Sequence, residues 1–344
     1  MRILSVGTMS GISNTCRFRN MALEEIADKV DVVNSEEKPI SIWYKIAYHM
    51  FIRGLPIGLP DCSSANKKII NFIKLNKYDI IWIDKGVTIK SRTLKKIRKF
   101  NPEAKIVSYS PDNMALRHNQ SQNYLNCIPL YDYHITTKSY IIDDMKKLGA
   151  KNIMFVCKSY ESKFHYPREI TNDDLLRLGC DVGFVGAWEK ERMESILYLT
   201  RNGIKVRVFG NKKWKMCEND NPNLIIEDHG LFDEDYSKSF RCFKISLCFL
   251  RKMNFDQQTA RTMEIPASGG FMLGERTKEH MMLFEEGKEA EFFDSNEELL
   301  EKCRYYLEYE EERKKIIEGG LRRCKESGYS NVETIRKILN NIMS

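Results

Sequence analysis

The sequence predicts an α/β protein built from parallel sheets that carry helices on both faces. Short apolar runs alternate with helical patterns from one end of the chain to the other, which is the βαβ rhythm of such sheets. At 344 residues the chain is too long for one small core, so two domains are expected. Its hydrophobic fraction of 42% and charged fraction of 30% are those of an ordinary globular protein.

The first half of the chain contains one complete series of these elements. Helical patterns such as Ser91–Phe100 and Ser139–Leu148 separate the apolar runs. An aperiodic segment with a proline, Ser159–Arg168, predicts the interdomain linker, so the first domain is expected to span residues 1–165. The predicted strands are short runs that each end at a polar turn: Arg2–Val6, Asp79–Ile83, Lys105–Tyr109, Tyr133–Thr136 and Asn152–Val156.

A second series starts at Asp181, where DVGFVGAW predicts a strand that ends in a glycine turn. Helices are predicted over Glu189–Asn202, over Asn296–Gly319 as one long element, and over Asn331–Met343. We therefore expect a second domain over residues 166–325 and a terminal helix over 326–344 that packs back on the first domain. The further predicted strands of this series are Ile204–Phe209, Leu224–Ile226, Lys244–Leu250, Phe271–Leu273 and Ala290–Phe293.

Together the two series predict two tandem Rossmann-like domains that face a central cleft. In such sheets ligands bind beyond the carboxyl ends of the strands.

Composition excludes several classes of protein. No run approaches the roughly 18–20 apolar residues that span a bilayer, and the N-terminus enters a strand pattern without a signal peptide. The ten cysteines show neither CxxC spacing nor histidine partners, which favours reduced thiols of a cytoplasmic protein and predicts no metal site.

Charge is unevenly distributed between the two halves. Residues 1–170 contain 27 Lys or Arg against 16 Asp or Glu, while the remainder contains 28 against 32. The basic first half and the mildly acidic second half indicate different partners for the two domains.

The segment FDQQTARTMEIPASGGFML, Phe255–Leu273, combines a polar helical pattern with a turn. Asp256 and Glu264 are eight residues apart, so a helix would bring both carboxylates near one face. Its start would lie at the carboxyl edge of the sheet, where a helix N-terminus suits a phosphate. Gly269 and Gly270 then allow the chain to turn into a buried strand.

This segment resembles the donor-site motif of GT-B glycosyltransferases, in which an acid is followed eight residues later by Glu and then by a Gly-Gly turn. In more detail, TARTMEIPASGGFMLGERTKEHMMLFEEGKEAEFF is similar to group-1 glycosyltransferases related to spore-maturation (CgeB-like) proteins. The segments YSPDN (Tyr109–Asn113) and YDYHITTKS (Tyr131–Ser139) are similar to mid-domain segments of that subgroup. One departure is Asp256, which stands where the family usually has Glu.

The resemblance implies a donor site in the second domain. Glu264 would bind the ribose of a nucleotide-sugar, and Arg261 with Thr259 would contact the diphosphate, because a leaving diphosphate needs cations or N–H donors when no metal is present. The other implied donor-binding residues are Asp256, Gln257, Gln258, Gly186, Arg192 and Gly210. Two plainer interpretations stay open: an exposed helix with an Arg261–Glu264 pair, and a surface pair between Arg192 and Glu189.

The first domain contains weaker candidates for the acceptor side. The loop Gly7–Arg17 is a strand-to-helix connection in which Gly11 would face the cleft and Asn14 or Ser13 would cap the helix. Asp112 follows a strand and is the candidate general base, although a turn-forming role is equally expected. Lys138 is a candidate for the cleft. His134 is interpreted as a core histidine, and His118 is a second candidate base.

Two basic segments have further interpretations. The cations in Lys90–Phe100 predict a solvated helix face. The segment Trp43–Leu59 mixes aromatic side chains with Lys45 and Arg53, which predicts either a core helix or an interfacial anchor on an anionic membrane.

The sequence therefore predicts a cytoplasmic, metal-independent glycosyltransferase that needs no cofactor, with a slight preference for retention that rests on the family resemblance. Its partners would be a nucleotide-sugar donor, a glycan, lipid-linked or protein acceptor, and the inner face of an anionic membrane. Two alternatives remain: a sugar-nucleotide epimerase of the same fold, and a non-enzymatic basic binding protein. Nucleic acid is not expected, because no recognisable binding module is present.

Overall fold

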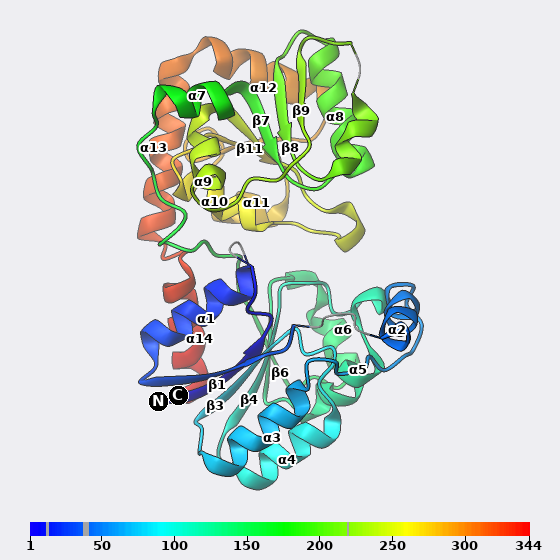
Figure 1. The fold of residues 1–344 in the computed structure, drawn as a ribbon. Helices are drawn as coiled ribbons and strands as arrows, with labels where there is room; N and C mark the ends of the chain where they lie inside the picture. Colours follow the sequence, from blue (N-terminus) through cyan, green and yellow to red (C-terminus); the bar gives the residue numbers. More distant parts are fainter. Residues whose placement is uncertain (12–13, 37–40, 219) are drawn as a thin grey trace. The chain divides into compact units, whose positions relative to one another are not determined.

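The computed structural model describes residues 1–11, 14–36, 41–218 and 220–344, and it divides into two compact units (Figure 1). The first unit consists of residues 1–157 together with 331–344, and the second of residues 158–330. The segment that was predicted as the linker packs within the second unit. There the Tyr160 N–H donates to the Tyr329 carbonyl at 3.2 Å, and Arg168 donates to the Ser237 hydroxyl at 2.9 Å.

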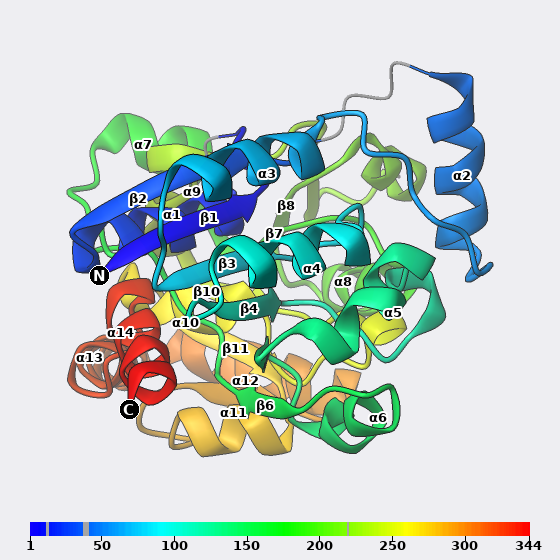
Figure 2. The ribbon, with the colours of Figure 1, turned by 90° about the horizontal axis from the view of Figure 1, so that it is seen from below.

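The first unit contains a six-stranded, all-parallel sheet with the order β2-β1-β3-β4-β5-β6. Helices α3 and α4 pack through Ile69 and Leu94 on one face, and α1 and α14 pack through Leu23 and Ile338 on the other (Figures 1 and 2). The strands are β1 (Arg2–Gly7), β2 (Lys29–Asn34), β3 (Ile80–Asp84), β4 (Lys105–Ser110), β5 (Tyr133–Thr136) and β6 (Asn152–Phe155). The α-helices are α1 (Thr15–Ile26), α2 (Ile42–Ile52), α3 (Ala65–Leu75), α4 (Ser91–Phe100), α5 (Gln122–Cys127), α6 (Ile142–Lys147) and α14 (Asn331–Met343).

The second unit repeats this architecture with the parallel order β12-β11-β10-β7-β8-β9. Its core includes the fully buried Phe184, Trp214 and Phe271. The strands are β7 (Cys180–Val185), β8 (Val206–Phe209), β9 (Leu224–Glu227), β10 (Phe243–Cys248), β11 (Met272–Glu275) and β12 (Glu291–Phe293). The α-helices are α7 (Asn172–Leu178), α8 (Lys190–Arg201), α9 (Asp233–Cys242), α10 (Ala260–Ala267), α11 (Lys278–Leu283), α12 (Asn296–Glu308) and α13 (Glu310–Glu326).

The predicted α/β class with two Rossmann-like units is confirmed, and two elements differ from the prediction. Strand β2 was not predicted, although Lys29–Asn34 pairs with β1 along its whole length. The single helix predicted over Asn296–Gly319 is two helices, because Tyr309, with φ −97° and ψ 80°, leaves the helical region between α12 and α13.

Each sheet has one point at which the direction of strand addition reverses. In the first unit the chain runs from β1 to β2 and then crosses to β3 on the other side of β1. In the second unit it runs from β7 through β8 and β9, and then crosses to β10 on the other side of β7. The crevice beyond the carboxyl ends of two such strands is the usual ligand site of open α/β sheets.

In the part of the chain that the structure describes, none of the helices is both long and apolar enough to cross a membrane.

Candidate functional site

The segment from Phe255 to Leu273 connects β10 to β11 through the short helix α10. Phe255 adopts a left-handed backbone with φ 53°, and the helix begins only at Ala260. The expectation that Asp256 and Glu264 share one helical face is therefore wrong, because Asp256 lies in the loop before the helix. Gly269, with φ 77°, makes the predicted turn into β11.

The N-terminal end of α10 is held by a chain of buried hydrogen bonds. The Thr259 N–H donates to the Thr262 hydroxyl at 3.0 Å, and that hydroxyl lies 2.8 Å from His280 Nε2. His280 Nδ1 lies 2.6 Å from the Glu275 carbonyl, so the ring donates there and Nε2 accepts from Thr262. Burial lowers the pKa of His280 to about 4, and the ring is neutral at physiological pH.

Two arginines meet at the reversal point of the second sheet. The guanidinium carbons of Arg261, from α10, and Arg192, from α8, lie 5.4 and 5.7 Å from the centre of the Phe184 ring. A Cβ atom at Gly186, just past β7, would lie 2.6 Å from Phe184 and 3.2 Å from Arg261. A glycine is therefore needed for the guanidinium of Arg261 to lie against this strand end.

Arg192 joins the ends of the two strands that flank the reversal point. Its guanidinium donates to the Ala187 carbonyl at 2.9 Å and to the Leu250 carbonyl at 3.0 Å. It also pairs with Glu189 at 3.4 Å, but it is buried, so it is more than the surface pair considered from the sequence. Burial, together with the charge of Arg261, lowers the pKa of Arg192 to about 10. The Nε atoms of both arginines are buried without a hydrogen-bond partner.

Glu264 is buried in the second half of α10. Its Oε2 accepts a 2.5 Å hydrogen bond from the Tyr236 hydroxyl, and its Oε1 lies 3.8 Å from His165 Nε2. Burial and the Glu264 carboxylate keep the pKa of Tyr236 well above its usual value, so the phenol remains a donor. Burial also lowers the pKa of His165, which favours its neutral form.

The remaining predicted donor residues occupy different environments. Gln258 is fully buried, where it accepts from the Lys158 N–H at 2.8 Å and donates to Glu279 at 2.6 Å. Both ends of its amide are thus engaged inside the fold. Gln257 and Asp256 are half-buried in the loop before α10. A Cβ atom at Gly210 would lie 2.3 Å from the Gly186 carbonyl oxygen, so this glycine allows close packing at the strand ends.

In the first unit, Asn14 caps α1 as predicted, since its side chain accepts from the Cys16 N–H at 2.9 Å. The alternative cap, Ser13, lies outside the described residues. Gly11 has φ 92° and is exposed in the same loop. Asp112 follows β4 and forms an ion pair with Lys85 at 2.6 Å.

Three other first-unit candidates are placed inside the fold. Lys138 is buried, with 1% of its surface exposed. His134 is a buried core histidine, as interpreted from the sequence, and its Nε2 lies 2.9 Å from the Ile128 carbonyl. The Nε2 atom of His118 is buried without a hydrogen-bond partner.

Sequence reasoning missed several residues that shape these sites. Phe184 was read as part of a strand, and Tyr236 and His165 gave no signal because their contact with Glu264 spans many residues of sequence. Lys85 had a usable signal, since it lies two residues past the predicted strand Asp79–Ile83, much as Asp112 lies three residues past the predicted strand Lys105–Tyr109.

Residues 191–340 match a family model described as glycosyl transferase-like. This match includes most of the second unit and continues into α14. Most of the second unit is therefore similar in sequence to this family. No curated protein sequence matches the chain.

Several solved structures have the same fold as this chain over its whole length. HepE from Anabaena, in complex with UDP-glucose, is 11% identical with a TM-score of 0.64, covering 100% of this chain and 99% of its own. Sucrose-phosphate synthase from Thermosynechococcus elongatus is 9% identical with a TM-score of 0.68, at 100% and 99% coverage. A Listeria monocytogenes protein proposed to be a UDP-N-acetylglucosamine 2-epimerase is 12% identical with a TM-score of 0.54, at 99% and 95% coverage. At these identities the similarity shows the fold, which is the GT-B type, while the family match supports glycosyltransferase as the enzyme class.

Proposed function

We propose that this protein transfers a sugar from a uridine diphosphate sugar to an acceptor hydroxyl. The observation that carries the proposal is the pair of guanidinium groups, Arg192 and Arg261, at the reversal point of the second sheet. Two like charges placed near one ring repel each other, so an anion that binds at Arg261, the less buried of the two, relieves that repulsion. Uridine is favoured because HepE, which has the same fold, binds UDP and UDP-glucose.

In the reaction, the bond between the anomeric carbon and the diphosphate oxygen breaks while a bond from the acceptor oxygen forms. The electron pair of the broken bond leaves on the nucleoside diphosphate, and the acceptor loses its hydroxyl proton. Arg261 and the N-terminus of α10 would stabilise the charge that develops on the diphosphate. We propose that these groups perform this role without a metal ion, so that activity should persist in excess chelator.

The remaining donor contacts follow from the same placement. The Glu264 carboxylate would accept a hydrogen bond from a ribose hydroxyl. Its orientation is fixed by the hydrogen bond that it accepts from Tyr236. Asp256, Gln257 and Thr259, which precede or cap α10, would lie towards the transferred sugar and the diphosphate. Because Gly186 and Gly210 have no side chain, they would allow the nucleotide-sugar to approach the backbone closely at these strand ends.

On the acceptor side we propose Asp112 as the group that takes the acceptor proton. Its carboxylate lies just past the end of β4 and is held in place by the Lys85 ammonium at 2.6 Å. A retaining reaction, which the family resemblance slightly favours, gives Asp112 a different role: the leaving diphosphate takes the proton, and Asp112 only orients the hydroxyl. Asp112→Asn separates the two roles: a base should be lost with a steep fall in kcat, whereas an orienting group should mainly raise KM.

The location that we propose is the cytoplasm, at the inner face of an anionic membrane. Its support is the spacing of the ten cysteines, which favours reduced thiols, and the basic first half of the chain.

The decisive experiment compares UDP-, GDP-, CMP- and dTDP-sugars by thermal shift and calorimetry. We expect UDP-sugars to stabilise the protein, and Arg261→Gln to weaken UDP binding about tenfold to a hundredfold, as expected for lost charge-assisted hydrogen bonds. The matched control is Arg201→Gln, which removes an arginine at the end of α8 that lies away from Arg192. This variant should bind UDP as the wild type does. If none of the nucleotides stabilises the protein, the proposal fails.

One rival has an observation in its favour, namely the Listeria protein with the same fold. An epimerase would convert its nucleotide-sugar without an acceptor. Product analysis with UDP-sugar alone distinguishes the two, because an epimerised UDP-sugar would overturn the transferase proposal.

A further inference from the structure

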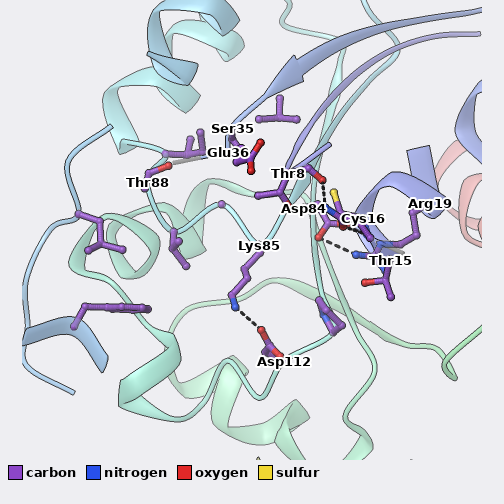
Figure 3. Close-up of a pocket in the computed structure, with 18 of the residues that line it drawn as sticks. Thr8, Thr15, Cys16, Arg19, Ser35, Glu36, Asp84, Lys85, Thr88 and Asp112 are labelled. Carbon is purple, nitrogen blue, oxygen red and sulfur yellow. Dashed lines mark hydrogen bonds and ion pairs between the residues drawn. The ribbon is translucent and has the colours of Figure 1, made fainter. Parts of the chain in front are cut away.

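A cavity of about 510 Å³ lies at the reversal point of the first sheet (Figure 3). It is bordered by residues at or just past the ends of β1, β3 and β4, including Thr8, Lys85 and Asp112. It is therefore the counterpart, within the first unit, of the site at the end of β7 in the second.

The floor of this cavity is a rigid ion pair, in which the charges of Arg19 and Asp84 neutralise each other. Arg19 and Asp84 form two hydrogen bonds of 2.7 and 3.0 Å, with both side chains buried, and Arg19 lies over the Tyr109 ring at 4.3 Å. Burial raises the pKa of the neighbouring Cys16 thiol to about 12, so this thiol is not a nucleophile. The floor can hold a neutral ligand in place but offers no unpaired charge of its own.

Besides the Glu36 carboxylate, the other polar groups that line the cavity suit hydroxyl groups. Thr8, Ser35 and Thr88 each contribute a hydroxyl group to the lining, and the Lys85–Asp112 pair contributes a donor and an acceptor side by side. Lys85 adopts a left-handed backbone with φ 58°, which is uncommon for a residue other than glycine and is typical of functional sites.

The opposite wall of the cavity is formed by helix α2. Tyr44, Tyr48 and Phe51 line it, and the two tyrosine rings are stacked with their centres 6.0 Å apart. Aromatic rings beside hydroxyl groups form a surface that suits the apolar face of a sugar ring.

The outer face of α2 is apolar and exposed. Ile42 and Trp43 are each 76% exposed, and Ile46 and Ile52 are also exposed. Figure 2 shows α2 standing away from the sheet of its own unit. Monomeric proteins rarely expose such a patch unless it binds a partner or a membrane.

The charges around α2 favour one partner. Residues 41–60 contain two exposed cations, Lys45 and Arg53, and no carboxylate, although Glu36 and Asp61 lie just outside this range. Aromatic and branched apolar side chains mixed with cations are the signature of a helix that lies in the interface of an anionic bilayer.

We propose that the acceptor is an amphiphile: α2 lies on an anionic lipid surface while the cavity behind it binds the hydroxyl-bearing headgroup. The acceptor role rests on the proposed function, whereas the binding of lipid and headgroup does not. A single helix thus provides both the membrane contact and the aromatic wall of the headgroup site, so that binding to the surface brings the cavity to its substrate.

The first test is flotation of the full-length chain with phosphatidylcholine vesicles that contain or lack phosphatidylglycerol. We expect binding that depends on the anionic lipid and weakens with salt, and that falls about tenfold or more in the double variant Trp43→Ser, Ile46→Ser. The matched control is Leu75→Ser, which removes an exposed leucine from α3 of the same unit and should bind as the wild type does. Absence of binding at low salt would overturn the proposal, as would equal binding of the double variant. A dimer that the double variant abolishes would also overturn it, by assigning α2 to a second copy of the chain.

The second test addresses the cavity, with octyl β-glucoside below its micelle concentration and methyl β-glucoside as probes. Saturation-transfer NMR should show the sugar protons of octyl β-glucoside in contact with the protein, and Tyr44→Ala should remove that signal. If Tyr44→Ala leaves the signal unchanged, or if neither glucoside binds, the headgroup site is refuted.

The failure of this proposal can be distinguished from failure of the proposed function. UDP binding is measured on the second unit and should be unchanged in every α2 variant. If the protein binds UDP but neither vesicles nor glucosides, the transferase proposal stands and the amphiphile proposal is refuted. If it binds vesicles and glucosides but no UDP, the lipid and headgroup site stands and the transferase proposal is refuted.

Discussion

Phe184 lies beneath two guanidinium groups, and this arrangement has an energetic cost in the absence of a ligand. Cation–π attraction offsets part of the repulsion between Arg192 and Arg261, but their Nε atoms remain buried without partners. Native proteins leave few such groups unsatisfied, and those that remain often mark a site of function. At the scale of single residues, the second unit is therefore prepared to bind an anion.

Glu264→Gln should specifically weaken recognition of the ribose. The neutral amide would lose the charge-assisted bond with Tyr236, so we expect UDP to bind about tenfold more weakly, while 2′-deoxy-UDP is affected less. Calorimetry with both nucleotides measures the difference. Tyr236→Phe keeps the carboxylate and should give a smaller effect. An equal loss for both nucleotides would indicate that Glu264 contributes to folding rather than to ribose binding.

Candidate site residues could be read from the sequence more readily than their neighbours. Glu264 and Arg261 became candidates because they belong to a short motif whose spacing is visible along the chain. Tyr236 and His165 were missed because their proximity to Glu264 depends on the packing of α9 and of residues 158–170 against α10. Asp256 was placed on a helix because a helical spacing cannot reveal that Phe255 adopts a left-handed backbone.

At the scale of elements, the turn between α10 and β11 depends on Gly270 for steric reasons. A Cβ atom there would lie 2.7 Å from the Phe240 carbonyl oxygen and 2.8 Å from its Cβ. Gly270→Ala should therefore lower the free energy of unfolding by about 2–3 kcal/mol, because the backbone contact cannot yield easily. Gly203→Ala is the contrasting control: its φ of 85° is positive, unlike that of Gly270, but nothing lies within 4 Å of the added Cβ, so about 1 kcal/mol is expected from backbone strain alone. Urea denaturation of both variants checks the difference, and equal losses would contradict the steric account.

His280 should make the anchoring of α10 dependent on pH. Its pKa falls from 6.5 to about 4 in the fold, so the unfolded chain takes up the proton first as the pH decreases. The contribution of His280 to stability is thus fully present above about pH 6.5 and is lost as the pH falls towards 4, by on the order of 3 kcal/mol in total.

His280→Gln removes this titration. Denaturation at pH 7.5 and about pH 5 should show a smaller decrease in stability for the variant than for the wild type. His134 and His165 also have a lowered pKa, so part of the decrease should remain in the variant. An identical decrease in both proteins would show that His280 does not titrate as described.

Most strands could be predicted because they are buried on both faces and therefore read as short apolar runs. β2 could not, because it lies at the edge of its sheet and its sequence KVDVVN mixes charge with valine. The break between α12 and α13 was also hidden, since Tyr309 and the glutamates around it fit a helical pattern equally well. Local sequence determines where an element can form, whereas burial against neighbours decides where it ends.

At the scale of the whole molecule, the same topological rule places a candidate site in each unit. In the basic unit with the cavity and in the unit with the paired arginines, the candidate site lies at the strand where the order of strands reverses, so the proposed acceptor and donor sites fall in different units. The two units were predictable from the βαβ rhythm, and the assignment of donor and acceptor to them was implied by the family resemblance. The cavity wall from α2, in contrast, depends on tertiary packing.

The terminal helix α14 completes the core of the first unit, although the chain reaches it only after the second unit. Ile335, Ile338, Leu339 and Ile342 pack with Ala22 and Leu23 of α1. Ile338→Asp should therefore destabilise the first unit by about 3–5 kcal/mol, because it buries an unpaired charge in an apolar cluster. UDP binding by the second unit should persist.

Hydrogen exchange checks this prediction. Amide protection should fall in β1 and β3, while the protection that UDP gives to the second unit is retained. Asn340→Asp, an exposed position on the same helix, controls for the added charge and should leave both patterns unchanged. If Ile338→Asp instead abolishes UDP binding along with protection of β1, the two units unfold as one cooperative body, and the donor site depends on the core that α14 completes.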